Sequence, residues 1–326
     1  MITKIKTSGM SREEWLEERR KSIGGSDLGA ILGLNKWSSP YAVWANKTGR
    51  VPDAEPNEAM RQGTDLEDYV AQRFMEKSGL KVVRENAILR NSDYPHMHAN
   101  IDRRIVGMRA GLECKTASAL SASRFSGGDF PESYYAQCVA YMAVTGYDAY
   151  YLAALVLGKE FKVYQMTTDP HAEAPEWCES SVYVGPEEFR GIRDAVSEFW
   201  EYVETETEPP VDMSAATADT IAAIYPESNG ESVDLFGLDD TFAAYLAAKA
   251  RLDGEKKAVE LYSNLIKQRL GEAEAGSCGS YMASWKTQHR DTFDVKAFRA
   301  EHPNFDLSPY FKTSTFRKFT VKEISA

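Results

Sequence analysis

The sequence predicts an α/β (α+β) fold in which helices flank a central mixed β-sheet, with a helical C-terminal extension. Three observations support this prediction. Short apolar segments alternate with turn residues between residues 81 and 167, as strands do. Helical patterns with recognisable ends lie on both sides of this stretch. A polar segment with two prolines, residues 205–210, separates an expected core, residues 1–208, from an extension, residues 209–326.

The helices follow from local signals at their ends. Residues 11–21 have the pattern of a helix, because Ser11 is a good N-cap and Glu14 completes a capping box. Gly79 and Gly146 each follow a run of helical periodicity, where a glycine ends a helix readily. Further helices are predicted at residues 28–32, 41–47, 57–78, 131–144 and 186–203.

The strands and the extension follow from apolar runs and turn residues. Strands are predicted at residues 81–89, 96–106, 111–116, 148–157 and 160–167. Beyond the linker, residues 239–270 have the composition of a long helix, which we expect to bend or break at Gly254. Residues 281–286 and 315–321 resemble strands.

Composition excludes several classes of protein. The 326 residues include 38 Lys and Arg against 49 Asp and Glu, and the net charge of −11 argues against nonspecific coating of nucleic acid or of a membrane. A local basic channel remains compatible with this charge. No apolar run approaches the ~20 residues of a membrane helix. None of the four cysteines forms a C-x-x-C pair. We therefore expect a cytoplasmic protein that does not contact a membrane.

Two acidic residues and a lysine form the strongest chemical signal. Asp102 lies near the middle of one predicted strand, and the next strand carries Glu113 and Lys115 on one face, with Cys114 on the other. A hairpin between these strands brings Asp102 to the same face. Two buried carboxylates need a counter-ion, and oxygen ligands suit Mg²⁺ or Mn²⁺. The alternative is a surface hairpin with an ordinary Glu–Lys pair.

Other polar residues support this reading when taken together. Gln137 and Tyr141 lie one turn apart on a predicted helix that is otherwise apolar, so the glutamine needs polar partners. Arg19 precedes Ser26 by seven residues across a Gly-Gly turn that leads into a helix, a combination suited to binding phosphate. Ser26 acting only as a helix cap, and Glu67 as a solvated helical glutamate, are the plain alternatives.

These residues resemble, in their order along the chain, the lambda exonuclease and YqaJ-type phage recombinase family, a branch of the PD-(D/E)xK nucleases. The resemblance covers about residues 10–205 and is greatest to prophage-encoded alkaline exonucleases. The motifs that carry it are Arg19, Ile23-Gly-Gly-Ser26-Asp27, Gly63 with Glu67, Asp102 with Glu113-Cys-Lys115, and Gln137 with Tyr141.

The resemblance implies a fold, an activity and partners. It implies a restriction-endonuclease-like core and a 5′→3′ exonuclease that degrades linear double-stranded DNA to 5′-mononucleotides. The 3′ single-stranded tails would serve homologous recombination through a single-strand annealing protein. It further implies a ring-shaped homotrimer around the duplex, in the cytoplasm of a bacterial host cell.

The resemblance also implies roles at the metal site. Asp102 and Glu113 would be ligands, together with the backbone carbonyl of Cys114. Lys115 would orient the attacking water and help to deprotonate it. Glu67 would hold the second of two Mg²⁺ or Mn²⁺ ions, directly or through water. The proline that the family usually has before the metal aspartate is replaced by Ile101, a position that supplies no ligand.

A second set of implied roles concerns DNA. Arg19, Ser26 and Gln137 would bind the 5′-phosphate, with Asn100 a further candidate, and Tyr141 completes the Q-x-x-x-Y pattern. From the residues themselves, Lys36 and Trp37 form a loop that is suited to meet the duplex end, with the tryptophan stacking on bases. The alternative for this pair is a buried tryptophan beside a solvated lysine.

Basic residues also concentrate in the C-terminal region, at Lys286, Arg290 and residues 312–322. They are suited to face DNA or a neighbouring subunit, and a solvated edge that balances an acidic helix is the plain alternative.

Two other functions compete with the exonuclease. One is a Cas4-like or RecB-like nuclease, which shares the Q-x-x-x-Y helix, although the scattered cysteines do not match an iron–sulfur cluster. The other is a catalytically inert scaffold that binds DNA or the annealing protein. Intact acidic and lysine positions disfavour the scaffold.

Overall fold

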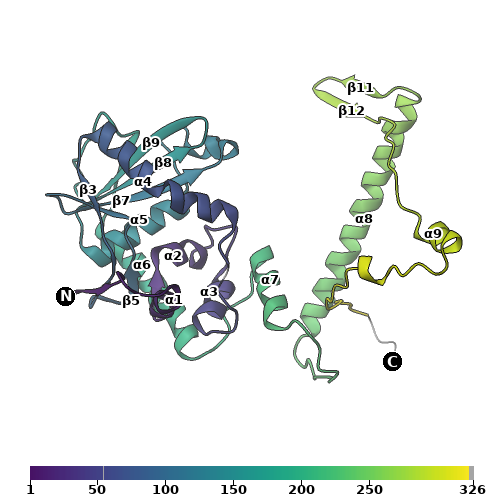
Figure 1. Ribbon diagram of the computed structural model, residues 1–326, viewed down its shortest axis with the longest axis horizontal. Helices are drawn as coiled ribbons and strands as arrows, with labels where there is room; N and C mark the ends of the chain where they lie inside the picture. The colour runs from purple at the N-terminus through teal and green to yellow at the C-terminus, as the bar shows by residue number, and fades with distance from the viewer. Residues whose placement is uncertain (54, 323–326) are drawn as a thin grey trace. The chain divides into compact units, whose positions relative to one another are not determined.

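The structure, a computed structural model, describes residues 1–53 and 55–322. The chain divides into two compact units, Met1–Tyr225 and Pro226–Ala326. In Figure 1, the first unit consists of helices packed around β-strands, and the second is built on one long helix. The predicted α/β core, with a mixed sheet flanked by helices, is confirmed.

The helices and strands of the first unit alternate along the chain. Its strands are β1 (Ile2–Lys6), β2 (Ile23–Gly24), β3 (Val82–Arg84), β4 (Ala87–Asn91), β5 (Tyr94–Ala99), β6 (Arg103–Ile105), β7 (Ala110–Ala117), β8 (Ala149–Val156), β9 (Glu160–Thr167) and β10 (Ser180–Tyr183). Its helices are α1 (Arg12–Arg20), α2 (Gly25–Ile31), α3 (Pro40–Lys47), α4 (Glu58–Ser78), the 3₁₀ helix η1 (Ala119–Phe125), α5 (Glu132–Thr145), α6 (Pro186–Glu204) and α7 (Ala215–Ile224).

The helix ends obey the local signals in the sequence. The Ser11 side chain accepts a hydrogen bond from the backbone N–H of Glu14, and the Glu14 carboxylate accepts one from the N–H of Ser11, which completes the capping box. Helices α4 and α5 both end at glycines in the left-handed conformation, Gly79 at φ 73° and Gly146 at φ 61°.

The strands form two mixed sheets in the first unit. The six-stranded sheet has the order β10-β9-β8-β7-β6-β3, with parallel pairs at β10–β9 and β7–β8. The four-stranded sheet has the order β1-β4-β5-β2, and its β2–β5 pair is parallel. The prediction that residues 96–106 form one strand is wrong, because the chain leaves the smaller sheet after β5 and enters the larger one at β6. Asp102 lies in this crossover and not in the middle of a strand.

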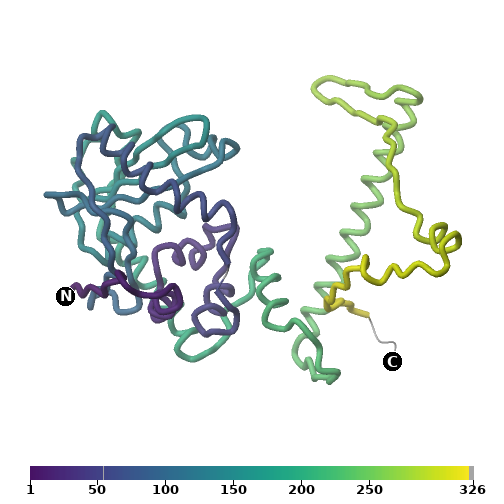
Figure 2. Tube along the Cα trace, viewed as in Figure 1, coloured from purple at the N-terminus to yellow at the C-terminus, as the bar shows by residue number. Residues whose placement is uncertain are grey.

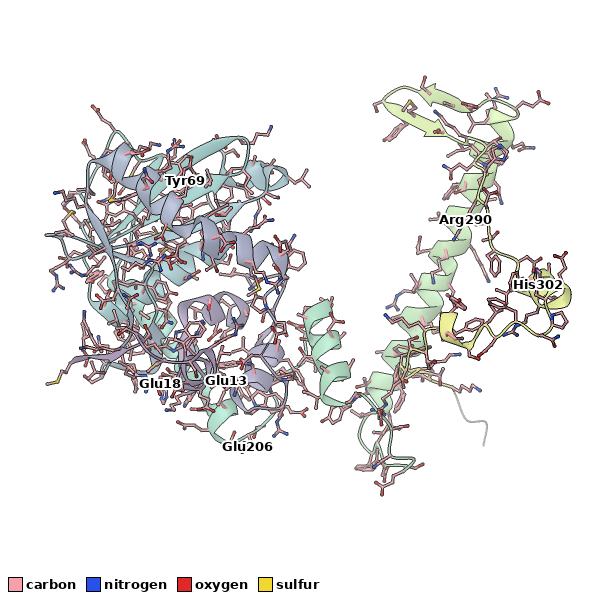
Figure 3. All side chains as sticks on the ribbon, viewed as in Figure 1. Glu13, Glu18, Tyr69, Glu206, Arg290 and His302 are labelled. Atoms are coloured by element: carbon pink, nitrogen blue, oxygen red, sulfur yellow. The ribbon has the colours of Figure 1, made fainter. Side chains whose placement is uncertain are left out.

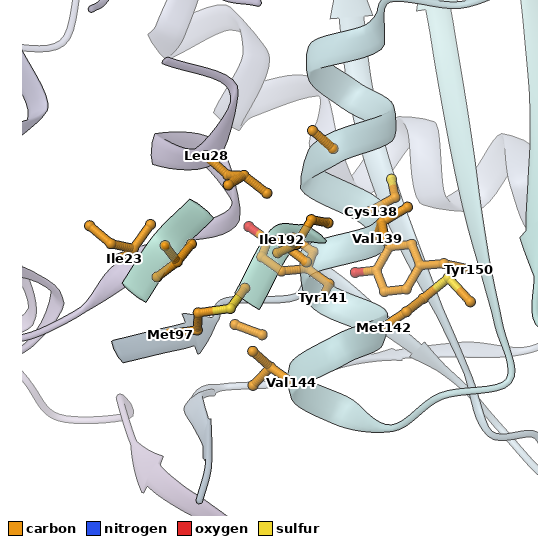
Figure 4. Close-up of a cluster of buried hydrophobic side chains, with 14 of the residues drawn as sticks. Ile23, Leu28, Met97, Cys138, Val139, Tyr141, Met142, Val144, Tyr150 and Ile192 are labelled. Atoms are coloured by element: carbon orange, nitrogen blue, oxygen red, sulfur yellow. The ribbon is translucent and has the colours of Figure 1, made fainter. Parts of the chain in front are cut away.

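Strand β8 is buried on both faces and divides the core in two. On one face, Tyr151 and Ala153 pack with Phe74 of α4. On the other, Tyr150 and Leu152 pack with α5. Figure 4 shows Tyr150 in this second cluster beside the labelled residues of α5. Burial on both faces explains why β8 reads as a continuous apolar run and not as an alternating one.

Helix α7 belongs to the first unit, so the division at Tyr225 comes after the expected boundary at residue 208. Thr217 of α7 is buried and donates a hydrogen bond to Ser39, the N-cap of α3, at 2.8 Å. This contact ties the segment after the proline-containing linker to the helices that precede it.

The second unit has little interior. Its elements are α8 (Asp239–Leu270), β11 (Ala275–Cys278), β12 (Tyr281–Ser284), α9 (Val295–Glu301) and the 3₁₀ helix η2 (Ser308–Tyr310), and Figure 2 traces them in order. Helix α8 runs through Gly254 without interruption, so of the expected bend or break there, the break is wrong. Residues 315–321 form no strand, because no described strand pairs with them. None of the described residues from 226 to 322 is buried.

Within residues 1–53 and 55–322, no helix is both long enough and apolar enough to cross a bilayer.

Candidate active site

The crossover between the two sheets places Asp102 next to Glu113. Strands β6 and β7 pair antiparallel, with Arg103 opposite Leu112, and the same register continued by one residue sets Asp102 opposite Glu113. The Asp102 Oδ2 atom accepts a hydrogen bond from the backbone N–H of Cys114 at 2.8 Å. The backbone of Cys114, which follows Glu113 on β7, therefore fixes the position of the Asp102 carboxylate.

Glu113 is the centre of a polar cluster on the α5 side of β7. The Lys115 ammonium lies 2.7 Å from Glu113 Oε1. The Gln137 amide of α5 donates to the same oxygen at 2.6 Å and contacts the Tyr141 hydroxyl at 3.0 Å. Cys114 packs on the opposite side against the α4 core, as side-chain alternation requires. The structure thus brings Glu113, Lys115, Gln137 and Tyr141 together.

Burial and mutual repulsion disfavour the charged forms of the two carboxyl groups in this cluster, which contains a single ammonium. Burial raises the pKa of both carboxyl groups, and repulsion from Glu113 raises that of Asp102 further. Burial alone would lower the pKa of Lys115, but attraction to Glu113 and Asp102 raises it above its ordinary value. Glu113 is only 3% exposed, and its Oε2 atom has no hydrogen-bond partner. One ammonium does not neutralise the buried Glu113 and the partly buried Asp102 together, so the donor set fits a cation.

Glu67 lies near this cluster but is held by an arginine. Arg103, which is buried on β6, donates to Glu67 and to the backbone carbonyl of Asp102, the latter at 2.7 Å. It also contacts Asp68 at 2.7 Å. In residues 1–53 and 55–322, no three His, Cys, Asp or Glu side chains already lie together as a metal site. The guanidinium occupies the glutamate oxygen that a second ion would use.

Arg103 is the residue of this cluster that the sequence analysis missed. Two consecutive arginines, Arg103 and Arg104, begin β6, and alternation along a strand requires one of them to point inward. The signal was present, but an inward arginine is recognisable only when carboxylates are known to surround it.

Arg19 and Ser26 meet at a second polar cluster, near the start of α2. An Arg19 Nη2 atom donates to Ser26 Oγ at 3.2 Å. Asp27 accepts from the backbone N–H of Gly24 at 3.0 Å and pairs with the buried Lys47 ammonium at 2.8 Å. Although burial raises the pKa of Asp27, Lys47 and Arg19 lower it to about 2. The carboxylate is therefore charged and already paired.

A cavity of about 860 Å³ opens beside this pair. It lies between α1, α2, α3 and the start of α4. The basic side chains that line it are Arg12, Arg19, Arg20, Lys47 and Arg61. Of these, only Arg19 was foreseen from the sequence, because the others come together through the packing of separate helices. Asp27, Asp53 and Asp65 also line the cavity, and the cations outnumber them, so the net positive lining suits an anion such as a phosphate.

Tyr141 joins the two clusters. Helix α2 lies so close to α5 that a Cβ on Gly25 would come within 2.5 Å of the Tyr141 ring. The hydroxyl of the same tyrosine accepts a hydrogen bond from the Gln137 amide. The structure therefore groups Gln137 with Glu113 and not with Arg19 and Ser26, where the resemblance implied it would act.

Comparison with known proteins identifies the family. The family described as the YqaJ-like viral recombinase domain matches residues 14–148. The uncharacterized protein YqaJ of Bacillus subtilis (strain 168) is 38% identical over 327 residues, which cover 98% of this chain and 97% of that protein. This chain belongs to the YqaJ family.

Solved structures show a more distant likeness. An alkaline exonuclease, LHK-Exo from Laribacter hongkongensis, is 17% identical with a TM-score of 0.45, over 60% of this chain and 93% of that chain. LHK-Exo in complex with dAMP gives 19% identity and a TM-score of 0.47 over the same shares. A phage-related exonuclease from Haemophilus somnus 129PT is 11% identical with a TM-score of 0.36, over 57% of this chain and 96% of that chain.

The residues of this YqaJ-family chain that were expected to contact DNA and are not yet placed are Asn100, Lys36 and Trp37. Asn100, two residues before Asp102, has a buried side-chain oxygen without a hydrogen-bond partner. The Lys36 ammonium lies 4.6 Å from the centre of the Trp37 ring. Trp37 is 81% exposed, so the alternative of a buried tryptophan is wrong. An exposed ring with a cation above it keeps one face open for contact.

Proposed function

We propose that this protein is a metal-dependent exonuclease that degrades linear double-stranded DNA in the 5′→3′ direction. The products would be 5′-mononucleotides and 3′ single-stranded tails. The observation that carries the proposal is the cluster of Asp102, Glu113 and Lys115, in which a partly buried and a buried carboxylate, the latter with one unsatisfied oxygen, lie beside an ammonium. Membership of a viral recombinase family supports a role in DNA processing.

The residues present fit one divalent cation well and a second less directly. Asp102, Glu113 and the Cys114 carbonyl would hold the first Mg²⁺ or Mn²⁺, and oxygen ligands suit both ions. Glu67 would help to hold a second divalent cation once its ion pair with Arg103 is broken. A divalent cation at this place supplies Lewis-acid activation of water and neutralises charge on a phosphodiester.

The side chains around the carboxylates position the reaction. Lys115 places a positive charge beside Glu113, where it attracts the phosphate and orients the attacking water. Gln137 holds Glu113 by its Oε1 atom, and Tyr141 orients the Gln137 amide. These contacts fix the glutamate before DNA arrives, which removes the entropy cost of ordering it at the moment of reaction.

Direction is assigned to the cationic cavity. A 5′-phosphate bound by Arg19 and Ser26 at the start of α2 would set the next phosphodiester at the carboxylates. Lys36 and Trp37 would meet the duplex end, and Asn100 would contact the phosphate between the two clusters. A ring-shaped homotrimer in the bacterial cytoplasm would keep the enzyme on duplex DNA and deliver the 3′ strand to an annealing protein.

The test is cleavage of linear duplex DNA with Mg²⁺, then with Mn²⁺. We expect Asp102→Asn to lower the rate by about 100-fold or more, because the change removes one anion of the cation site. Asp93→Asn, at an exposed aspartate in the turn between β4 and β5, is the matched control and should retain the wild-type rate. Equal cleavage by wild type and Asp102→Asn would refute the site. A wild type that binds DNA without cleaving it would favour the inert scaffold.

Direction has its own test. The wild type should digest a 5′-phosphorylated duplex faster than a 5′-hydroxyl duplex, and Arg19→Ala should abolish the difference. Arg193→Ala changes an exposed arginine on α6 and should leave the preference intact. A wild type indifferent to the 5′ end would refute the assignment of the cavity.

A further inference from the structure

Residues 281–322 of the second unit, which we call the aromatic–basic segment, differ in composition from the rest of the chain. They carry eight Lys and Arg against four Asp and Glu, a surplus of four positive charges, in a chain whose net charge is −11. Nine of these 42 residues are aromatic, compared with 11% of the whole chain. The proposed exonuclease site uses none of them.

The aromatic side chains of this segment face solvent within the second unit. Eight of the nine are exposed, and the exception, Phe298, is partly buried. Phe316 and Phe319 are 77% and 75% exposed. Figure 3 draws these side chains, with Arg290 and His302 labelled to locate the segment. So much exposed aromatic surface in one short stretch marks an interaction site.

The rings are arranged as neighbours and not as isolated residues. The centre of the Phe298 ring lies 5.2 Å from that of Phe293 and 5.4 Å from that of Phe305. Phe305 in turn stacks on Tyr310, with an angle of 20° between the rings and 6.1 Å between their centres. Tyr310 is 74% exposed, so a ring face at the end of this row remains open for a further flat partner.

Cationic side chains lie between the rings along the chain. Lys312 follows Phe311, and Lys318 lies between Phe316 and Phe319. In the part of the chain that the structure describes, neither lysine forms an ion pair with an acidic side chain. Each ammonium is therefore available to an external anion.

We propose that the aromatic–basic segment binds single-stranded DNA, with its rings stacking on bases and its lysines contacting phosphates. An unpaired strand offers base faces and phosphates in alternation, which matches the alternation of rings and cations. A duplex offers phosphates but hides its base faces, so it would leave the rings without partners. The positive surplus favours an anionic partner over an apolar protein surface.

The source of the strand rests on the proposed function, which leaves a 3′ single strand. The second unit would hold this strand as it forms. Binding itself requires no cleavage, so the two proposals can be tested separately.

The experiment measures the fluorescence anisotropy of a labelled oligothymidine of about 20 nucleotides with the full chain in EDTA, at several salt concentrations. Phe316→Ala with Phe319→Ala should weaken binding about tenfold or more, because two stacking contacts are lost. Lys312→Ala with Lys318→Ala should lower the slope of log Kd against log salt by about 1.4, since each phosphate contact on a single strand contributes about 0.7. A duplex of the same length should respond little to the phenylalanine changes.

Lys256→Ala with Lys257→Ala is the matched control, because it removes two exposed lysines of α8 that have no aromatic neighbours in sequence. This variant should keep the wild-type affinity and salt slope. Unchanged single-strand affinity in the phenylalanine variant would overturn the proposal. So would a change in oligomeric mass with unchanged affinity, which would assign the rings to a protein contact. Binding in EDTA without cleavage in Mg²⁺ would refute the exonuclease and leave this proposal standing.

Discussion

The two units of the chain use their aromatic residues in opposite ways. In the first unit, Trp44 and Tyr150 are fully buried, and the buried Tyr164 of β9 packs against the rings of Phe125 and Phe130. In the second unit, Phe316 and Phe319 are exposed, and none of the described residues from 226 to 322 is buried. Burial stabilises a fold and exposure offers a contact surface. We infer that stability is concentrated in the first unit and that the second is available for binding.

The largest expected effect comes from removing a buried ring. Trp44→Ala should lower the free energy of unfolding by about 3–5 kcal/mol, because it leaves a cavity in the core and removes a hydrogen bond from the indole to the Tyr202 carbonyl. Phe316→Ala should change it by less than about 0.5 kcal/mol. Urea unfolding followed by circular dichroism measures both. Similar losses in the two variants would show that the units are not different in this respect.

The next effect concerns the ion pair between Asp27 and Lys47. Asp27→Asn should lower the free energy of unfolding by about 3 kcal/mol, because it leaves the Lys47 ammonium, only 4% exposed, without its carboxylate. Glu187→Gln breaks an exposed pair with Arg190 on α6 and should cost less than about 0.5 kcal/mol. Equal costs would mean that water screens both pairs alike.

The same pair gives a pH dependence whose sign is fixed. The pKa of Asp27 falls from 3.8 to about 2 on folding, so the carboxylate contributes its full stability above pH 3.8. That contribution is lost as the pH falls towards 2. The difference in unfolding free energy between wild type and Asp27→Asn should therefore narrow over this range. A constant difference would contradict the lowered pKa.

A smaller effect is expected where α2 lies directly against the Tyr141 ring of α5 at Gly25. Gly25→Ala should destabilise the first unit by about 1–3 kcal/mol, because the new Cβ would press on the Tyr141 ring. The shift should also slow DNA cleavage, since Tyr141 orients Gln137. Gly63→Ala on α4 has open space around it and should stabilise the protein by about 0.5–1 kcal/mol. A neutral Gly25→Ala would show that α2 moves freely on α5.

Local signals were sufficient to predict most helices of the first unit. Gly79 and Gly146 end α4 and α5 because a glycine adopts the left-handed conformation without strain, and this depends on no distant residue. The strand prediction for residues 96–106 failed because the change of sheet at Asp102 is decided by two different pairing partners. Residues 315–321 are rich in β-branched and aromatic residues, as strands are, but composition alone does not provide a strand to pair with.

Some contacts of the candidate site were likewise predictable from the sequence, and others were not. The approach of Asp102 to Glu113 and Lys115 was predictable, because side-chain alternation and one hairpin are enough to produce it. The contact between Gln137 and Glu113, and the hold of Arg103 on Glu67, were not. Both depend on how α5 and α4 pack on opposite faces of the sheet, which no local pattern specifies.

The smallest expected effect tests the second unit itself. Gly254 lies in the middle of α8 with nothing within 4 Å of its added Cβ, so Gly254→Ala should stabilise the helix by about 0.5–1 kcal/mol. Helical circular dichroism during thermal unfolding measures the gain, and Gly237→Ala, at φ 86° before the helix, should instead be unfavourable. A gain at Gly254 would match the open surroundings of α8 in the second unit. A loss of more than about 1 kcal/mol would mean that another surface packs closely on α8 at this point, and the contrast between a buried first unit and an exposed second one would no longer hold.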